Sequence, residues 1–182
     1  MQISHHPVLQ LCLASLMLIN NVMASSPLAP LGFVLETTSP SDVRTQLKGK
    51  GSIESLGINR YSRGIMLKVA GKAFDVRGLK EVVFIFDAAD QLTAVNLHMD
   101  KRQFMSVFKL LKEKYVLVKK QIPFVGNKSA RFRYGKANIV LNAPHMSFDM
   151  TATYQTDKFE KAYRDSVAKD KVKHQKKERA TF

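Results

Sequence analysis

The chain has 182 residues, of which 45% are hydrophobic, and its 29 basic and 15 acidic residues give a net charge of +14. This composition is that of a globular protein. The only cysteine, Cys12, lies in a segment that we expect to be removed, which excludes disulfides, thiolate metal sites and a cysteine nucleophile from the mature chain.

The first predicted element is a secretory signal peptide. Residues 8–22 are mostly apolar but fall short of the about 20 apolar residues that a membrane-spanning helix needs. Val22 and Ala24 stand two apart, as small residues do before a cleavage site. We therefore expect a signal peptide at residues 1–24 and a mature protein that is periplasmic or secreted, with no transmembrane segment. The alternatives are an uncleaved anchor and a buried N-terminal helix.

The next part of the chain predicts one helix and four strands. Ser39, Pro40 and Asp42 have the pattern of a capped helix start, and Gly49 follows as a helix end. Strands are expected at Tyr61–Val69, Lys72–Val76, Glu81–Asp87 and Gln91–Met99. The loop at residues 87–90 predicts a hairpin between the last two strands.

A second helix and four more strands are predicted after Met99. Asp100 and Gln103 have the spacing of a capping box. A stripe at helical spacing, which predicts a core-facing side, follows at Phe104, Phe108, Leu111 and Tyr115. Strands are expected at Val116–Ile122, Ser129–Tyr134, Ala137–Leu141 and Met146–Tyr154.

The predicted elements give an α+β fold. Two helix-plus-four-strand units would form one antiparallel sheet with their helices on one face. Within the last strand, alternation places Met146 and Phe148 on the buried side. A C-terminal helix is expected from Asp157. We divide the mature chain into a single α+β domain at residues 25–168 and a basic flexible tail at residues 169–182.

The runs SPSDVRTQL and EVVFIFDAADQLTAVNLHM resemble the helix–sheet modules of the outer-membrane assembly lipoproteins of the small protein A type. They also resemble those of the β-lactamase inhibitor protein. The run PFVGNKSARFRYGKANIVLNAPHMSFDMTATY resembles uncharacterised exported proteins of Gram-negative bacteria. The resemblance spans residues 31–155 and implies the fold and an exported role in protein–protein interaction. It implies no catalytic residue, and the chain has no lipobox cysteine.

Positive charge is concentrated in one third of the chain. Eleven basic residues lie between Lys101 and Lys136, and Glu113 is the only acid among them. Such a block attracts anions and acidic surfaces, although a solvated face is the simpler interpretation. The predicted binding ridge comprises Lys119, Lys120, Lys128, Arg131 and Arg133. We expect an exported, non-enzymatic protein that binds an acidic protein partner in the cell envelope. The alternative is a binder of a small anionic ligand or glycan.

The sequence gives little support to catalysis or to nucleic-acid binding. On a regular strand, His145 and Asp149 would flank Ser147 too far apart for a triad. A metal site or an unrecognised hydrolase would require the fold to bring His98 and His145 together. No cofactor-binding motif is present, so no cofactor is expected. Strand alternation turns the aromatic neighbours of Arg131 and Arg133 to the opposite face, which disfavours a nucleic-acid platform.

Overall fold

The computed structural model describes residues 27–181. The expected signal peptide at residues 1–24 lies outside these described residues. Within the described part, no helix combines the length and the apolar composition needed to cross a bilayer.

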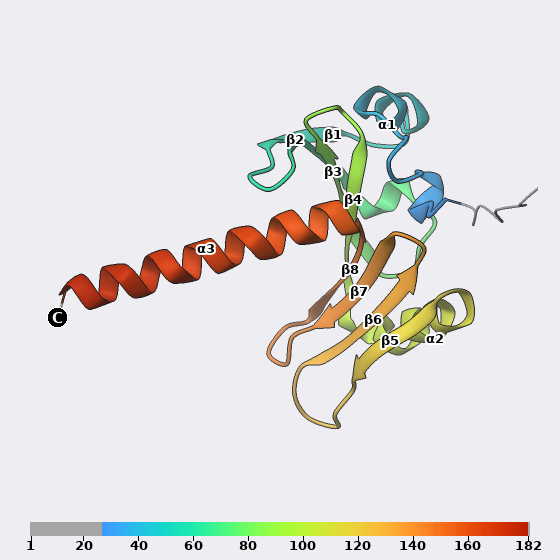
Figure 1. Ribbon diagram of the computed structural model, residues 1–182. Helices are drawn as coiled ribbons and strands as arrows, with labels where there is room; N and C mark the ends of the chain where they lie inside the picture. The colour runs from blue at the N-terminus through green and yellow to red at the C-terminus, as the bar shows by residue number, and fades with distance from the viewer. Residues whose placement is uncertain (1–26, 182) are drawn as a thin grey trace, which may run out of the picture.

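The centre of the described fold is an antiparallel sheet of eight strands (Figure 1). Their order is β1-β2-β3-β4-β8-β7-β6-β5, so two four-stranded meanders meet where β4 pairs with β8. The strands are β1 (Ile53–Ile58), β2 (Arg63–Ala70), β3 (Leu79–Asp87), β4 (Leu92–Asp100), β5 (Val116–Gln121), β6 (Lys128–Tyr134), β7 (Ala137–Ala143) and β8 (Asp149–Thr156).

Helices lie on both faces of the sheet. α1 (Pro40–Gln46) and α2 (Phe104–Lys114) lie on one face, whereas α3 (Asp157–Thr181) starts on the other and extends away from the body (Figure 1). The predicted α+β class, antiparallel sheet and C-terminal helix are confirmed. That the chain consists of two copies of one structural unit stays a prediction. Short 3-10 helices η1 (Pro30–Gly32), η2 (Gly71–Ala73) and η3 (Lys101–Gln103) join these elements.

The main core fills the space between the sheet and the first two helices. Phe84 of β3 and Phe132 of β6 are fully buried there, and α2 adds Phe104 and Phe108. The ring centroids of Phe108 and Phe132 are 5.8 Å apart. The predicted aromatic stripe of α2 therefore serves the core, where each large apolar side chain removes its surface from water.

A smaller apolar cluster on the opposite face seats the start of α3. Phe159 packs there with Val83, Ile85 and Ala94, residues that alternate with the main-core side chains of β3 and β4. The Tyr61 ring meets the Phe159 ring edge-on, with centroids 6.4 Å apart. This cluster fixes where α3 leaves the sheet.

The first predicted helix start is confirmed and the second is only partly right. The Ser39 hydroxyl accepts a hydrogen bond from the Asp42 amide, and the Asp42 carboxylate accepts one from the Ser39 amide. Asp100 instead accepts from the Arg102 amide at 2.9 Å. It therefore caps η3, a turn that precedes α2, and forms no capping box with Gln103.

In the first half, one strand prediction is wrong and one strand was missed. Residues 72–76 form η2 and a loop; η2 begins at Gly71, which lies so close to β3 that a Cβ there would be 2.2 Å from the Leu79 carbonyl oxygen. β1 was not predicted. It is an edge strand with one partly buried residue, Ile53, and five exposed ones, so no alternation marks it.

The last strand begins later than predicted, at Asp149. Residues 144–148 turn instead, because the Ser147 hydroxyl accepts a hydrogen bond from the Asp149 amide at 2.9 Å. Met146 and Phe148, expected in the core, are each 92% exposed.

The helix α3 includes the segment for which a tail was predicted. Residues 169–181 continue the helix, and the side chains at positions 171–179 are exposed on every side. The flexibility of this segment stays a prediction.

Candidate functional site

The structure divides the five residues of the predicted basic ridge between the two faces of the sheet. In the strand register, Lys119 of β5 lies opposite Arg131 of β6, and Arg133 follows two positions after Arg131. These residues belong to the face of the sheet on which α3 starts. Lys120 pairs with Ala130, a core-facing residue, and Lys128 lies on that same face by alternation. The five side chains therefore do not form one continuous ridge.

Arg131 and Arg133 are held by the first turn of α3. Nη1 of Arg131 lies 2.6 Å from Oε1 of Glu160. Arg133 donates to both carboxylate oxygens of Asp157, at 2.5 and 2.6 Å. Asn138 completes the network by donating to Asp157 at 2.8 Å and to Glu160 at 2.7 Å. Bidentate and charge-assisted bonds of this kind fix geometry as well as adding stability.

This network removes two cations from the predicted ridge. The hydrogen bond from Arg133 lowers the pKa of Asp157 below its ordinary value, against the opposing effect of burial. The same bond raises the pKa of Arg133. Glu160 is buried, with 8% of its surface exposed, so its charge requires the Arg131 and Asn138 donors. The two arginines therefore dock α3 on the sheet.

A polar groove of about 420 Å³ lies beside this network, between α3 and the sheet. Its floor comes from β4, β7 and β8, and its wall from the first turns of α3. Apart from two tyrosines, the polar and charged lining residues are Asn59, Asn96, Arg131, Asn142, Thr151, Thr153, Gln155, Glu160 and Arg164. The Tyr61 and Tyr163 rings, with centroids 5.0 Å apart, close one end. The groove combines hydrogen-bonding groups with cations, as a site for a polar or anionic ligand requires.

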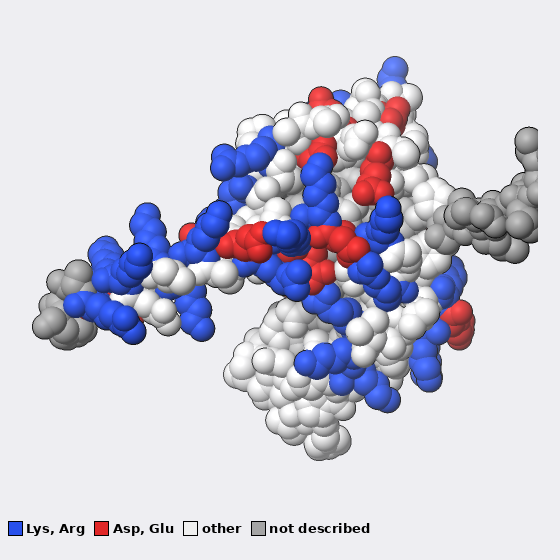
Figure 2. Space-filling view, viewed as in Figure 1, with Lys and Arg blue, Asp and Glu red and all other residues white. Residues whose placement is uncertain are grey.

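Beyond its docked turns, α3 presents the largest gathering of cations on a single element (Figure 2). The body holds the helix as far as Asp170, which forms an ion pair with Arg60 at 2.6 Å. Residues 169–179 carry six basic and two acidic side chains. Lys169, Lys173 and Lys176 line one shallow surface together with Ala168 and Val172. We call these five residues the cationic face of α3.

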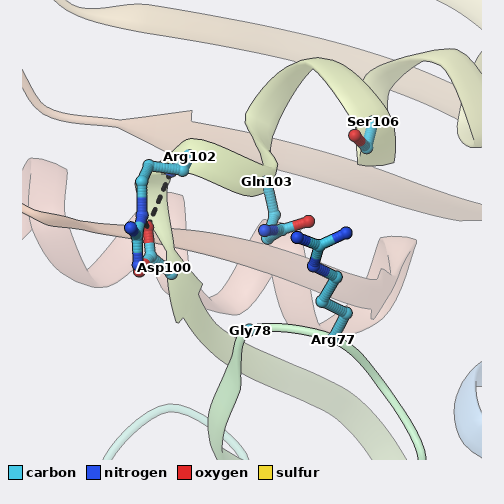
Figure 3. A pocket seen from close by; sticks show the side chains of 6 residues that line it. All are labelled: Arg77, Gly78, Asp100, Arg102, Gln103 and Ser106. Carbon is cyan, nitrogen blue, oxygen red and sulfur yellow. Dashed lines mark hydrogen bonds and ion pairs between the residues drawn. The ribbon is translucent and has the colours of Figure 1, made fainter.

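A second polar hollow, of about 440 Å³, lies where η3 leads into α2 (Figure 3). Arg77 and Gln103 face one another across it, and Arg102 bonds to Asp100 at its edge. The hydrogen bonds from Arg102 lower the pKa of Asp100 to about 2. Gly78 borders the hollow with a positive φ of 76°. The hollow is thus lined by groups that shape the turn into α2.

The histidines and their neighbours have separate partners. His98 lies 3.9 Å from Glu81. The His145 Nδ1 accepts a hydrogen bond from the Gly126 amide at 3.2 Å. Because His145 and Ser147 lie in a turn, the expected strand spacing does not apply, but Ser147 bonds the Asp149 amide rather than His145. Among the described residues, no group of three or more metal-binding side chains is clustered.

Sequence reasoning identified the arginines but missed the acids that hold them. Asp157 and Glu160 lie one helical turn apart, and Arg131 and Arg133 lie two positions apart on a strand. Only the docking of α3 on this face of the sheet shows that the spacing of the two acids matches the spacing of the two arginines. The groove residue Asn142 was missed for the same reason, because its neighbours come from distant parts of the chain.

Comparisons with protein-family models, curated proteins and solved structures give no match to this chain. The resemblance to exported helix–sheet modules therefore stays an expectation from the sequence.

Proposed function

We propose that the chain is an exported, non-enzymatic interaction protein that binds an acidic surface of a protein partner in the cell envelope. The cationic face of α3 makes the principal contact. In this proposal residues 1–24 are a signal peptide, and the remainder works in the periplasm or outside the cell.

One observation carries this proposal: the last third of α3 is a helix that buries no side chain between positions 171 and 179. The side chains at positions 171–179 are all exposed. Most helices in proteins are stabilised by packing an apolar face, and a helical segment of this length is marginal alone in water. A partner that covers the cationic face would supply the missing packing through Val172 and charge attraction through the lysines.

The distribution of charge supports the same surface. Arg131 and Arg133 are paired with acids of α3, so the positive charge of the predicted ridge is partly neutralised. The basic side chains of residues 169–179 outnumber the acidic ones six to two, and they extend away from the body (Figure 2). A projecting cationic element accelerates encounter with an acidic surface.

A charge-reversal series tests the proposal. The variant combines Lys169→Glu, Lys173→Glu and Lys176→Glu, which keeps good helix-forming residues in place. The immobilised variant should retain no specific acidic protein from envelope extract. The wild-type chain should retain one at low salt and release it at high salt, because exposed charge attraction is screened.

The matched control is Lys109→Glu with Lys112→Glu and Lys114→Glu, which makes the same charge change on the exposed side of α2. This control should retain the partner. Equal loss in both variants would mean that net charge alone governs retention, and would contradict a specific role for α3. Retention that is insensitive to salt would also contradict the proposal.

The polar groove favours a second candidate function, binding of a small anionic ligand or glycan. Arg164 and Asn142 line it, so Arg164→Gln and Asn142→Ala should each weaken calorimetric binding of an anionic oligosaccharide. Arg131→Ala is a poorer probe, because it also breaks the network that docks α3. Arg77→Ala, in the other hollow, is the control. Binding that is unaffected by the groove variants would remove this candidate.

A further inference from the structure

Two loops at one end of the sheet expose a cluster of large apolar side chains. Phe124 and Val125, in the loop between β5 and β6, are 102% and 65% exposed. Met146 and Phe148, in the loop between β7 and β8, are each 92% exposed. We call these four residues the apolar tip. Figure 2 shows an extensive surface without charged residues at this lower end of the molecule.

Hydrogen bonds hold the two loops beside one another. The His145 amide donates to the Asn127 side-chain oxygen at 2.7 Å, and the Gly126 amide donates to His145 Nδ1 at 3.2 Å. Lys101, the first residue after β4, also holds the second loop. Its side chain donates to the Pro144 and His145 carbonyl oxygens, and its amide donates to Phe148. The apolar side chains are thus presented together by an organised pair of loops.

The strands that lead into and out of the loop with Phe124 carry charge of one sign, whereas Asp149, which follows Phe148 in the other loop, is paired with Lys80. Between Glu113 and Asp149 the sequence has no acidic residue, although it includes seven basic ones. Three of the seven form a group that we call the basic collar: Lys119, Lys120 and Lys128. Lys119 and Lys120 lie near the end of β5 and Lys128 begins β6, so the collar brackets the loop that carries Phe124. The collar contains the three residues of the predicted ridge that do not dock α3.

We propose that the apolar tip inserts into the surface of an anionic lipid bilayer, with the basic collar on the lipid headgroups. Apolar side chains projecting from loops, rather than lining a hollow, suit a fluid layer that adapts its shape to them. Lysines adjacent to inserted apolar residues gain attraction from the negative surface potential and can extend their stems along the hydrocarbon boundary. The contact is independent of the cationic face of α3, which lies on a different element.

The absence of tryptophan from the sequence allows a direct test. Phe124→Trp places a single fluorophore at the tip. On vesicles of phosphatidylethanolamine and phosphatidylglycerol, its emission should shift to the blue and be quenched by brominated lipid. Leu110→Trp, at a site 57% exposed on α2, should show neither change. Because both reporters are local, binding of other segments to the vesicle does not imitate the expected result.

Loss-of-binding variants complete the test. Phe124→Ser with Met146→Ser and Phe148→Ser should lower the fraction that floats with these vesicles at least several-fold. The control, Ile58→Ser with Met105→Ser and Leu110→Ser, removes three other apolar side chains, which are 44–63% exposed, and should float like wild type. Lys120→Glu with Lys128→Glu should also reduce flotation. Vesicles without phosphatidylglycerol should bind wild type weakly.

Several results would overturn the proposal. One is normal flotation of the tip variant. Another is a blue shift of the Phe124→Trp emission that needs no lipid and grows with protein concentration, because that marks a contact between copies of the chain. A third is loss of the lipid-induced shift in the Lys169→Glu, Lys173→Glu and Lys176→Glu background, because membrane contact would then depend on α3.

Discussion

At the scale of single residues, basic side chains that lie opposite one another on two neighbouring strands have different roles. Arg131 faces Glu160, which is buried, whereas Lys119 lies opposite Arg131 on β5 and remains exposed. A cation beside a buried carboxylate stabilises the fold, because without it the carboxylate would lose its charge-assisted donor. An exposed cation contributes little to stability and remains available for binding.

Arg131→Ala should therefore destabilise the protein by about 1–3 kcal/mol, since it leaves the Glu160 carboxylate with Asn138 as its remaining side-chain donor. Lys119→Ala should change the free energy of unfolding by less than about 0.5 kcal/mol. Urea unfolding of both variants measures the difference. Equal destabilisation by the two substitutions would show that the Arg131–Glu160 pair does not stabilise the fold.

The ion pair of Asp157 predicts a loss of stability in acid. Because Arg133 lowers the pKa of Asp157 in the folded state, the unfolded chain binds this proton more readily. The contribution of Asp157 is complete above its unfolded pKa of about 3.9, and it is lost as the pH falls through the lower folded value. Asp157→Asn should be less stable at neutral pH and should lose less stability on acidification.

Unfolding midpoints between pH of about 2 and 7 test this expectation, because this range runs from neutral pH to well below the unfolded pKa. Asp75→Asn, which removes an exposed carboxylate between η2 and β3, is the control and should follow the wild-type curve. Parallel curves for wild type and Asp157→Asn would exclude a stabilising pair with Arg133.

At the scale of elements, α3 has two parts that differ in the burial of their side chains. Its first turns bury Phe159 and Glu160 and bind the sheet through the arginine network. Its last part has exposed side chains from position 171 to 179. The first part behaves as part of the domain, and the second as an appended surface. Apolar residues at helical spacing, Phe159, Ala162, Tyr163 and Val167, mark the first part in the sequence, although Tyr163 and Val167 are only about half covered, at 46% and 45% exposed.

Truncation after Asp170 should therefore leave the sheet intact. The free energy of unfolding should change by less than about 0.5 kcal/mol, because the side chains at positions 171–179 are exposed. Retention of the acidic partner should be lost at the same time. Thermal unfolding and pull-down on the same preparation measure the two effects. A large drop in stability would mean that the helix end supports the body.

At the scale of the whole molecule, the features that could be predicted correctly are those that depend on residues close together in the sequence. The Ser39 cap, the Phe104–Phe108 stripe and the β3–β4 hairpin depend on neighbours along the chain, and they are confirmed. β1 has no buried alternation to reveal it. The second pairing partner of β8 and the acids opposite Arg131 depend on contacts between distant segments, which periodicity does not carry.

The same distinction explains the candidate sites. Charge density along the chain indicated a binding surface near Lys119 and Lys120, and the structure leaves these two side chains exposed. It could not show that Arg131 and Arg133 dock a helix. Nor could alternation show that Met146 and Phe148 leave the strand, because a turn at Ser147 interrupts it. Because Arg131 and Arg133 are paired with acids of α3, the cations proposed to bind partners are those of the cationic face of α3 and of the basic collar.

The most direct test of the central claim is amide hydrogen exchange across α3, with and without the acidic partner that the wild-type chain retains. We predict fast exchange at residues 171–179 in the free protein, because the side chains of this segment are exposed, and marked slowing in the complex. Exchange in the docked turns around Phe159 should change little. Protection that appears in the groove or at the apolar tip, with residues 171–179 unchanged, would contradict the account.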